Sequence, residues 1–323
     1  MFKTPAATFK TFFFLSIGIL IFGDVMVFSA AQVLGLKDGG NSFSVSWKQI
    51  IISIAALGGA WLIAQFPLST IKFFAHRSLG IAVLVMFLLI PFGRDVNGNT
   101  NWISFGPIDF QPSEVAKLFL ILWAAYIIEK NYGNAKKITS SLVIGFGLVL
   151  LVVLKGGDLG SAIVIGLILM SLIFLAGADI KVIAIFGLVG AAGVAVLVLS
   201  ASYRMDRFTA FLHPFADGVY KNAGWQPAHS LMALGSGGLF GAGIGLSKQK
   251  WGNLAEAHTD FIFGVIGEEF GFVGVVCIIS LFMWLTRRIM YIGRQAIAMD
   301  RVFAGLVAQG VGIWIGFQAF INI

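Results

Sequence analysis

One carboxylate stands where a membrane-spanning helix is predicted to begin. Thr259 and Asp260 directly precede the apolar run that starts at Phe261. An aspartate at this place often caps the helix, which contributes about 1 kcal/mol. It can equally act as a general base that takes a proton from a hydroxyl group in a polar cavity. The spacing alone leaves both interpretations open.

Two acidic residues lie further along the same apolar run. Glu268 and Glu269 have no cationic neighbour within their own predicted helix. A charge inside a spanning helix costs about 2.5–3.5 kcal/mol on insertion scales. At least one of them must therefore face the protein interior, and we expect a Lys or Arg from another span as its partner.

A second group of charges lies in and beside the middle spans. Glu114 and Lys117 are three residues apart and share one face of a predicted helix. The two residues form a structural ion pair, Glu114 balances the helix dipole, or both belong to a functional site. Asp158 either caps the next helix or lines an outward cavity together with Lys155. The pattern does not separate these alternatives.

The segment 200–260 is rich in glycine and basic residues. Its glycines between 235 and 245 suit a backbone that folds back at the bilayer edge or offers N–H groups to an anion. A nucleotide-binding P-loop is excluded, because no glycine precedes a Lys-Ser or Lys-Thr pair at the required spacing. Glu256 and His258 have no second His and no Cys nearby, so we predict no dedicated metal site.

The composition decides what kind of chain positions these residues. Of the 323 residues 58% are apolar and only 11% are charged, and the mean hydropathy is +0.93. A soluble domain carries about 25% charged residues, so a soluble enzyme, a disordered chain and a disulfide-stapled secreted module are excluded. The single cysteine, Cys277, provides no disulfide framework. The net charge of +7 sits mainly in short loops, so it indicates membrane topology rather than nucleic-acid binding.

We predict an all-α polytopic membrane protein with a single transmembrane domain, 1–323. About 20 apolar residues cross a bilayer. Lys and Arg favour the cytoplasmic side by twelve to four in the short loops, which places the amino terminus inside and the segments 91–111 and 200–260 outside. The nine predicted spans are 11–31, 50–66, 70–90, 112–128, 138–154, 159–176, 182–199, 261–285 and 302–323.

Several motifs, in this order, resemble the SEDS family (shape, elongation, division and sporulation) over nearly the whole chain. The run from Glu256 to Phe263 is highly specific, and the stretches 207–212 and 249–251 are more similar to the division-type branch than to the elongation-type branch. The matching segments are 110–117, 158–160, 233–238, 257–263 and 267–269.

The resemblance implies a ten-helix bundle and a peptidoglycan glycosyltransferase that polymerises lipid II outside the bacterial cytoplasmic (inner) membrane, at the division septum. Asp260 matches the catalytic aspartate, and Trp102 and Glu114 match residues needed for activity. The implied partners are lipid II, a class B penicillin-binding protein with transpeptidase activity, other division proteins and membrane lipids, with no nucleic acid. No cofactor is certain, and a divalent cation, Mg or Mn, is an option.

We expect further residues to bind substrate or to support activity. The basic ones would stabilise the leaving pyrophosphate, and Glu114 with Lys117 would tie the fourth span to the outer loop that carries Trp102. The remaining expected residues are Gln111, Ser113, Lys155, Asp158, Arg204, Arg207, Ser236, Gly237, Lys248, Lys250, His258, Thr259 and Glu268.

Two departures from the family pattern affect these expectations. Ala255 replaces the usual proline, and the last loop and tenth helix are missing beyond Ile323, so we expect a truncated chain. Three other functions remain open: an elongation-type polymerase, a lipid II flippase without chemistry, and a scaffold that recruits a penicillin-binding protein.

Overall fold

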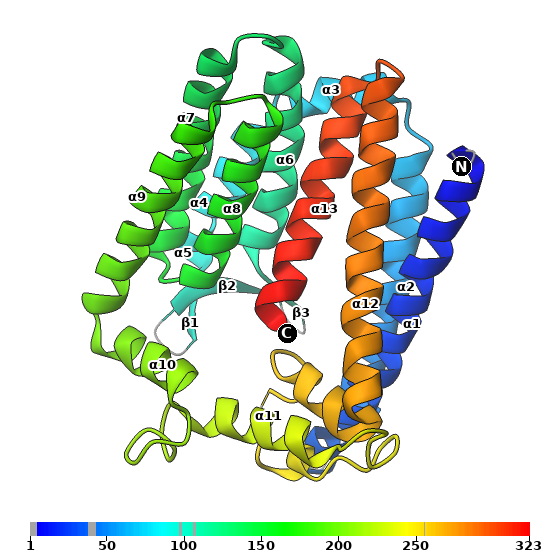
Figure 1. Cartoon of the computed structure of the whole chain (residues 1–323), viewed down its shortest axis with the longest axis vertical. Coiled ribbons are helices and arrows are strands. Elements are labelled where there is room, and N and C mark those ends of the chain that lie inside the picture. Colours follow the sequence, from blue (N-terminus) through cyan, green and yellow to red (C-terminus); the bar gives the residue numbers. More distant parts are fainter. Residues whose placement is uncertain (1–4, 38–42, 97–98, 106–107, 255) are drawn as a thin grey trace. The chain divides into compact units, whose positions relative to one another are not determined.

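The computed structural model describes residues 5–37, 43–96, 99–105, 108–254 and 256–323, and helices make up most of it (Figure 1). Ala255 and parts of the predicted outer segment 91–111 lie outside the described residues. The chain divides into two compact units: one contains Met1–Gln65, Ala195–Leu285 and Ala319–Ile323, the other Phe66–Val194 and Thr286–Gln318. Their boundaries cut through long helices, so the single transmembrane domain stays a prediction.

The first unit contains the amino-terminal helices and the elements that surround Asp260. Helices α1 and α2 pack against each other, and the Ser53 hydroxyl donates a hydrogen bond of 2.9 Å to Asp24 between them. The segment 200–260, predicted as a loop, contains three helical elements. The elements of this unit are α1 (Pro5–Lys37), α2 (Ser44–Ala64), α10 (Ser202–Leu212), α11 (Trp225–Ser236), the 3-10 helix η1 (Gln249–Trp251) and the first part of α12 (Ile262–Ala298).

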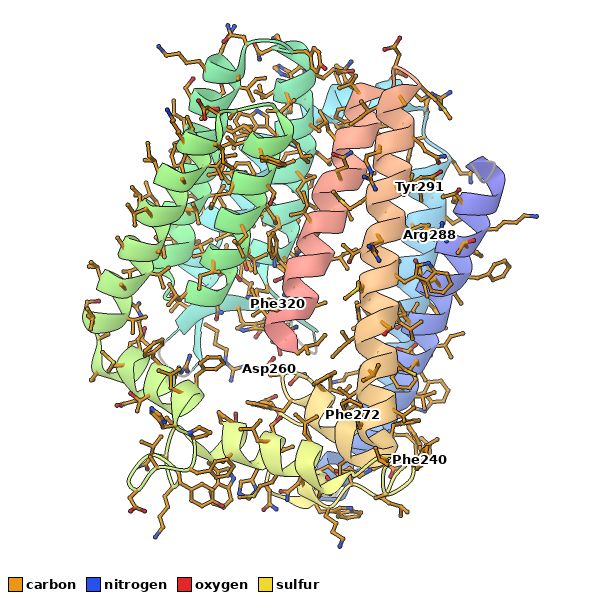
Figure 2. The ribbon with its side chains drawn as sticks, in the orientation of Figure 1. Phe240, Asp260, Phe272, Arg288, Tyr291 and Phe320 are labelled. Carbon is orange, nitrogen blue, oxygen red and sulfur yellow. The ribbon has the colours of Figure 1, made fainter. Side chains whose placement is uncertain are left out.

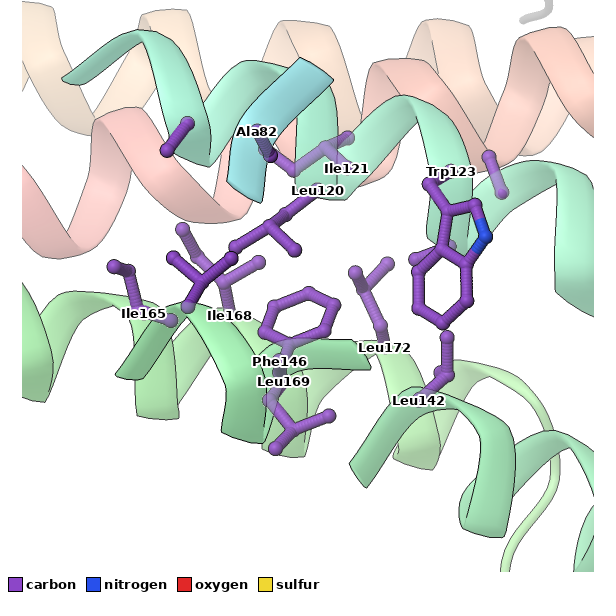
Figure 3. Close-up of a cluster of buried hydrophobic side chains, with 14 of the residues drawn as sticks. Ala82, Leu120, Ile121, Trp123, Leu142, Phe146, Ile165, Ile168, Leu169 and Leu172 are labelled. Atoms are coloured by element: carbon purple, nitrogen blue, oxygen red, sulfur yellow. The ribbon is translucent and has the colours of Figure 1, made fainter. Parts of the chain in front are cut away.

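The second unit is a bundle of helices with a small sheet. Its core is made of large aliphatic and aromatic side chains such as Leu120, Phe146 and Ile165, which fill the space between neighbouring helices (Figure 3). Its elements are α3 (Leu68–Ala75), α4 (Ser78–Phe87), α5 (Leu89–Phe92), β1 (Arg94–Val96), β2 (Asn99–Phe105), β3 (Ile108–Phe110), α6 (Pro112–Lys130), α7 (Ala135–Lys155), α8 (Leu159–Leu175), most of α9 (Ile180–Leu199), the later part of α12 and most of α13 (Val302–Asn322).

Local sequence explains where the helices of this bundle begin. Pro112 occupies the first turn of α6, where its missing N–H is harmless. Asn134 accepts a hydrogen bond of 3.0 Å from the Lys137 N–H and caps α7. Asp158 caps α8 in the same way. Because the connections between α6, α7 and α8 are short, consecutive helices run antiparallel.

The predicted loop 91–111 contains a three-stranded antiparallel sheet in the order β1-β2-β3. Arg94 is paired with Trp102, and Ile103 is paired with Phe110. Ile103 is buried against the second unit's core, which fixes the sheet beside the helices.

The all-α membrane class is confirmed, with the small sheet as an addition. Six described helices are long and apolar enough to cross a membrane, and they coincide with six of the predicted spans. The predicted span 70–90 is bent: α3 and the helix that follows it meet at 55° near His76 and Arg77. The predicted spans 112–128 and 159–176 form α6, which carries four charged residues, and α8, which has 17 residues. The count of nine spans and their orientation stay predictions.

Helix α12 is longer than the predicted span 261–285. It continues to Ala298, so Arg287, Arg288 and Arg294 lie on a helix and not in a loop. It is also broken at Gly271, whose φ of 67° and ψ of −165° are not helical. Glycine adopts this region without the steric penalty that a Cβ would bring.

Candidate active site

Asp260 lies in the turn that leads into α12, and its side chain is exposed (Figure 2). Buried apolar residues on either side anchor this turn: Leu254 and Ala257 pack into a cluster with Met26 and Val265. The backbone N–H of Phe261 also donates a hydrogen bond of 3.1 Å to the Glu256 carbonyl. The anchored turn therefore presents the carboxylate at the surface of its unit.

The geometry does not make Asp260 the cap of α12. The helix begins at Ile262, and the N–H groups of Gly264 and Val265 point to the Phe261 carbonyl. Within the described ranges, no hydrogen bond or ion pair engages the Asp260 carboxylate. An exposed carboxylate without a protein partner is available to a substrate, which favours its interpretation as a base.

The surroundings of Asp260 raise its pKa above the usual range for aspartate. Partial removal from water is the largest cause, because it disfavours the charged form. The negative charge of Glu256 raises the pKa further, and the positive charge of His258 lowers it. A carboxylate with a raised pKa binds a proton more strongly, so its ionised form is a better general base.

His258 and Thr259 directly precede Asp260, and their side chains have different surroundings. The Thr259 hydroxyl donates a hydrogen bond of 2.9 Å to Glu256 and orients that residue. His258 is half-buried, and its Nδ1 has no hydrogen-bond partner in the part of the chain that the structure describes. The described residues also contain no cluster of three or more His, Cys, Asp or Glu side chains that could hold a metal ion.

The glycine loop, residues 237–243, forms backbone hydrogen bonds with α12 on both sides of the break at Gly271. The N–H groups of Phe272 and Val273 donate to the carbonyls of Gly238 and Leu239, at 2.8 and 3.1 Å. In return, the N–H groups of Ala242 and Gly243 donate to the carbonyls of Glu268 and Glu269, at 2.9 and 3.0 Å. The backbone groups that the break leaves without helical partners are thus satisfied by the loop, as burial or a membrane requires.

This exchange explains the glycines better than anion binding does. Gly237 lies so close to the Gly267 carbonyl that a Cβ would overlap it. The Ser236 hydroxyl donates to the Ala233 carbonyl of its own helix at 3.0 Å. The glycine loop was predicted to fold back at the membrane edge or to bind an anion, and two of its N–H groups are already used by α12.

Both glutamates of α12 are buried and have partners from the segment before Asp260. Glu268 accepts hydrogen bonds from the Ser247 hydroxyl at 2.6 Å and from the backbone N–H groups of Lys248 and Gln249 at 2.9 and 3.2 Å. Glu269 forms an ion pair of 2.7 Å with Lys250. The expected cation exists for Glu269, but it comes from η1 and not from another span.

The basic residues predicted to bind pyrophosphate have different surroundings. Lys250 is completely buried in its ion pair, so its predicted role in substrate binding is wrong. Arg204 donates to the Tyr203 hydroxyl at 2.8 Å and to the Leu197 carbonyl at 3.2 Å. Arg207 lies over the Tyr203 ring, with its guanidinium carbon 5.9 Å from the centroid, and both Arg207 and Lys248 are exposed. These two remain available to an anion.

The second unit contains another group of predicted site residues, connected through Asp158. One oxygen of this carboxylate accepts the Ser161 N–H at 2.9 Å and caps α8. The other accepts from Gln111 at 3.0 Å and from Asn101 at 3.3 Å. Asp158 is thus both the predicted cap and a connection between β2, α6 and α8.

Further hydrogen bonds in this unit join the same elements. The hydroxyls of Ser113 and Ser161 lie 3.2 Å apart, and the Thr100 N–H donates to the Gly156 carbonyl at 3.0 Å. Trp102, next to Asn101, is half-buried. Lys155, at the end of α7, is exposed. The predicted outer segments 91–111 and 155–158 therefore lie together within this unit.

The predicted ion pair between Glu114 and Lys117 is confirmed, at 2.6 Å. The Lys117 side chain is only 1% exposed, whereas that of Glu114 is 36% exposed. The Lys117 Nζ also donates to Gln318 at 2.9 Å and lies 5.2 Å from the centre of the Trp314 ring. Both of these contacts of Lys117 connect the pair to α13, and the expectation that the pair ties α6 to the loop of Trp102 stays a prediction.

The sequence interpretation missed three polar contacts. Asp24 lies inside the first apolar run and could have been found by the same search that found Glu268. Ser29 and Gln318 are neutral residues in apolar helices, and only the fold reveals their ionic partners. Asp260 belongs to the first unit and Trp102, Glu114 and Asp158 to the second, and each group is described within its own unit.

Comparison with known sequences identifies similar proteins over almost the entire chain. The model of the FtsW/RodA/SpoVE family, described as cell cycle proteins, matches residues 9–323. A probable peptidoglycan glycosyltransferase FtsW from Taylorella equigenitalis (strain MCE9) is 40% identical over 93% of this chain and 84% of its own length. A protein of the same name from Aeromonas salmonicida (strain A449) is 34% identical over 96% of this chain and 79% of its own length.

Solved structures show the same arrangement of helices. One chain from work on how a peptidoglycan synthase complex coordinates polymerization and crosslinking has a TM-score of 0.72 and 25% identity, over 97% of this chain and 85% of that chain. The crystal structure of the Thermus thermophilus rod shape determining protein RodA has a TM-score of 0.66 and 25% identity, over 97% of this chain and 83% of that chain.

Proposed function

This chain belongs to the FtsW/RodA/SpoVE family of cell cycle proteins, and on that premise we propose that it is a division-type peptidoglycan glycosyltransferase. It joins lipid II units into glycan strands on the outer face of the bacterial cytoplasmic membrane. The names of relatives that are 34–40% identical support the activity and the division type. The apolar helices and the family make it a multi-pass membrane protein.

The observation that carries the proposal is the exposed Asp260 carboxylate with its raised pKa. A sugar hydroxyl is a weak nucleophile near neutral pH and needs a positioned base. Asp260 takes the proton from the 4-hydroxyl of the acceptor sugar, and the oxygen attacks the anomeric carbon of the donor. The new glycosidic bond forms as the bond to the lipid pyrophosphate breaks, and the pyrophosphate leaves with the bonding electrons.

This reaction inverts the donor carbon and needs only one carboxylate, unlike hydrolases that use a pair. The leaving pyrophosphate gains negative charge, which nearby cations stabilise. Among the basic residues of the first unit that were predicted for this role, Arg207 and Lys248 are exposed. Lys155 of the second unit stays a prediction for the same role.

The proposed partners follow from the chemistry of the wall. Glycan strands have to be crosslinked, and the similar structure comes from work on a peptidoglycan synthase complex that couples polymerization with crosslinking. We infer a class B penicillin-binding protein as the transpeptidase partner, together with other division proteins at the septum. The lipid tails of the substrate stay in the bilayer, beside the apolar surface of the helices.

A reconstitution experiment tests the function. The purified protein is placed in vesicles with lipid II and its transpeptidase partner, and glycan strands are separated on a gel. Glycan strands that form only when this protein is present support its assignment as a glycosyltransferase. Movement of fluorescent lipid II across the bilayer without strand formation would identify a flippase instead. If neither strands nor lipid movement were observed, the remaining function would be that of a scaffold.

A further inference from the structure

A buried ion pair ties together the two ends of the segment that carries Asp260. Lys250 and Glu269 lie 2.7 Å apart, and both side chains are 0% exposed. The Ser29 hydroxyl lies 2.7 and 2.9 Å from the two oxygens of Glu269 and accepts a hydrogen bond of 2.9 Å from Lys250. The three residues come from α1, η1 and α12, so the cluster joins the first helix to two elements that lie far later in the sequence.

Stability alone is a weak reason for this cluster. Two charges removed from water lose their hydration, and an apolar pair of similar volume is often as stable or more stable. What the ion pair does provide is a fixed separation, because the ammonium and the carboxylate hold each other at 2.7 Å through a charge-assisted hydrogen bond. In this structure the fixed points are the start and the end of the segment 250–269.

Asp260 lies near the middle of that segment. Glu268, next to Glu269, also fixes the start of the segment. It accepts hydrogen bonds from the Ser247 hydroxyl and from the N–H groups of Lys248 and Gln249. Between these two fixed ends, Asp260 lies in the short turn that precedes α12. The buried side chain of Ala257 and the backbone hydrogen bonds of the turn fix its position. A shift of η1 relative to α12 would therefore move the carboxylate.

We propose that Lys250, Glu269 and Ser29 are positioning residues that hold the Asp260 carboxylate where it meets the acceptor hydroxyl. The proposal rests on the proposed function, since it assigns these residues to the geometry of that reaction. None of the three touches the substrate. They act through the backbone of the segment 250–269, and α1 takes part in the site through Ser29.

The test uses the full chain with a double variant, Lys250→Met/Glu269→Leu, which replaces the ion pair by apolar side chains of similar size. It avoids the single Lys250→Met change, which would leave Glu269 buried without a cation and endanger folding. Rates of lipid II polymerisation are measured over a range of lipid II concentrations and of pH, beside thermal unfolding in detergent.

We expect the double variant to keep its unfolding temperature and its KM while kcat falls about 10-fold to 100-fold, as misplacing a reactive group by about 1 Å does. The acid limb of the pH profile should also move to lower pH. Asp260 owes its raised pKa to partial burial and to Glu256, with His258 opposing, and a loosened turn lets water reach the carboxylate. The charge-swapped variant Lys250→Glu/Glu269→Lys restores a pair in the same place and should recover much of kcat.

The matched control is Lys72→Met/Glu129→Leu, which removes an ion pair in the other unit by the same replacements. It should leave kcat and the pH profile unchanged. A folded Lys250→Met/Glu269→Leu variant with the kcat and acid limb of the original protein would overturn the positioning role. Asp260→Asn separates the two claims: if it abolishes the strands while the double variant is fully active, the proposed function stands and only the positioning proposal fails.

Discussion

Glu256 stands four residues before Asp260 in the same turn, and its negative charge helps to raise the pKa of Asp260. Because the base must be ionised to accept a proton, polymerisation should be lost as the pH falls through this raised pKa. Glu256→Gln removes the charge and should move the acid limb of the rate profile to lower pH. His258→Gln removes the opposing positive charge and should move it to higher pH.

Rates of lipid II polymerisation measured across the acid range check these two shifts. The substitutions serve as controls for each other, because they alter neighbouring residues and predict opposite directions. Shifts in the same direction, or none in either variant, would mean that the acid limb does not report Asp260.

The close approach of Gly237 to the Gly267 carbonyl predicts a stability effect. Gly237→Ala would force the glycine loop away from α12, and overpacking of this kind costs about 1–3 kcal/mol. Gly235→Ala, two residues earlier and within α11, is the matched control, since a Cβ there meets no atom within 4 Å. Thermal unfolding in detergent should show a loss for Gly237→Ala alone. Equal unfolding temperatures for both variants would contradict the tight contact.

The two roles of Asp158 can be separated by two substitutions. Asp158→Asn keeps an oxygen that can cap α8 but replaces the oxygen that accepts from Gln111 and Asn101 by an NH2 group, which can only donate. Asp158→Ala removes both, and the lost cap alone costs about 0.5–2 kcal/mol. Chemical unfolding should therefore rank the alanine variant below the asparagine variant and both below the original protein. If the two variants unfolded alike, the cap would contribute nothing.

The unequal burial of Glu114 and Lys117 predicts unequal effects of removing either partner. Glu114→Ala leaves the fully buried Lys117 without its anion, and the loss should stay below the roughly 3–5 kcal/mol of a fully buried pair because water already screens the 36% exposed Glu114. Lys117→Met leaves Glu114, which water can reach, and should cost less. Yield of folded protein and thermal unfolding compare the two. A larger loss from Lys117→Met would show that Glu114 is the residue that depends on the pair.

Local spacing predicted the parts of the site that depend on neighbours in sequence. The ion pair of Glu114 with Lys117 follows from three-residue spacing on a helix, and the Asp158 cap follows from its place before an apolar run. The bend in the span 70–90 was not predicted, although it lies at His76 and Arg77, two of the polar residues within that run. The long apolar runs indicated helices for the same reason, because hydropathy is a local property.

Contacts between distant segments could not be predicted in this way. Lys250 was expected to bind the leaving pyrophosphate because it is a basic residue in the outer segment 200–260, and only the fold brings it to Glu269. The break at Gly271 was missed because one glycine among 40 gives no signal, although the loop at 237–243 is what makes the break possible. The sheet around Trp102 was taken for a loop because its strands are short.

The most direct test replaces Asp260 by asparagine in the complete protein, purified and supplied with lipid II and its transpeptidase partner. The change keeps the size of the side chain and removes its ability to accept the hydroxyl proton. Strand formation should fall by about 100-fold to 10,000-fold, as the loss of a general base does, while thermal unfolding stays the same. Undiminished glycan strands from the folded Asp260→Asn protein would contradict the account.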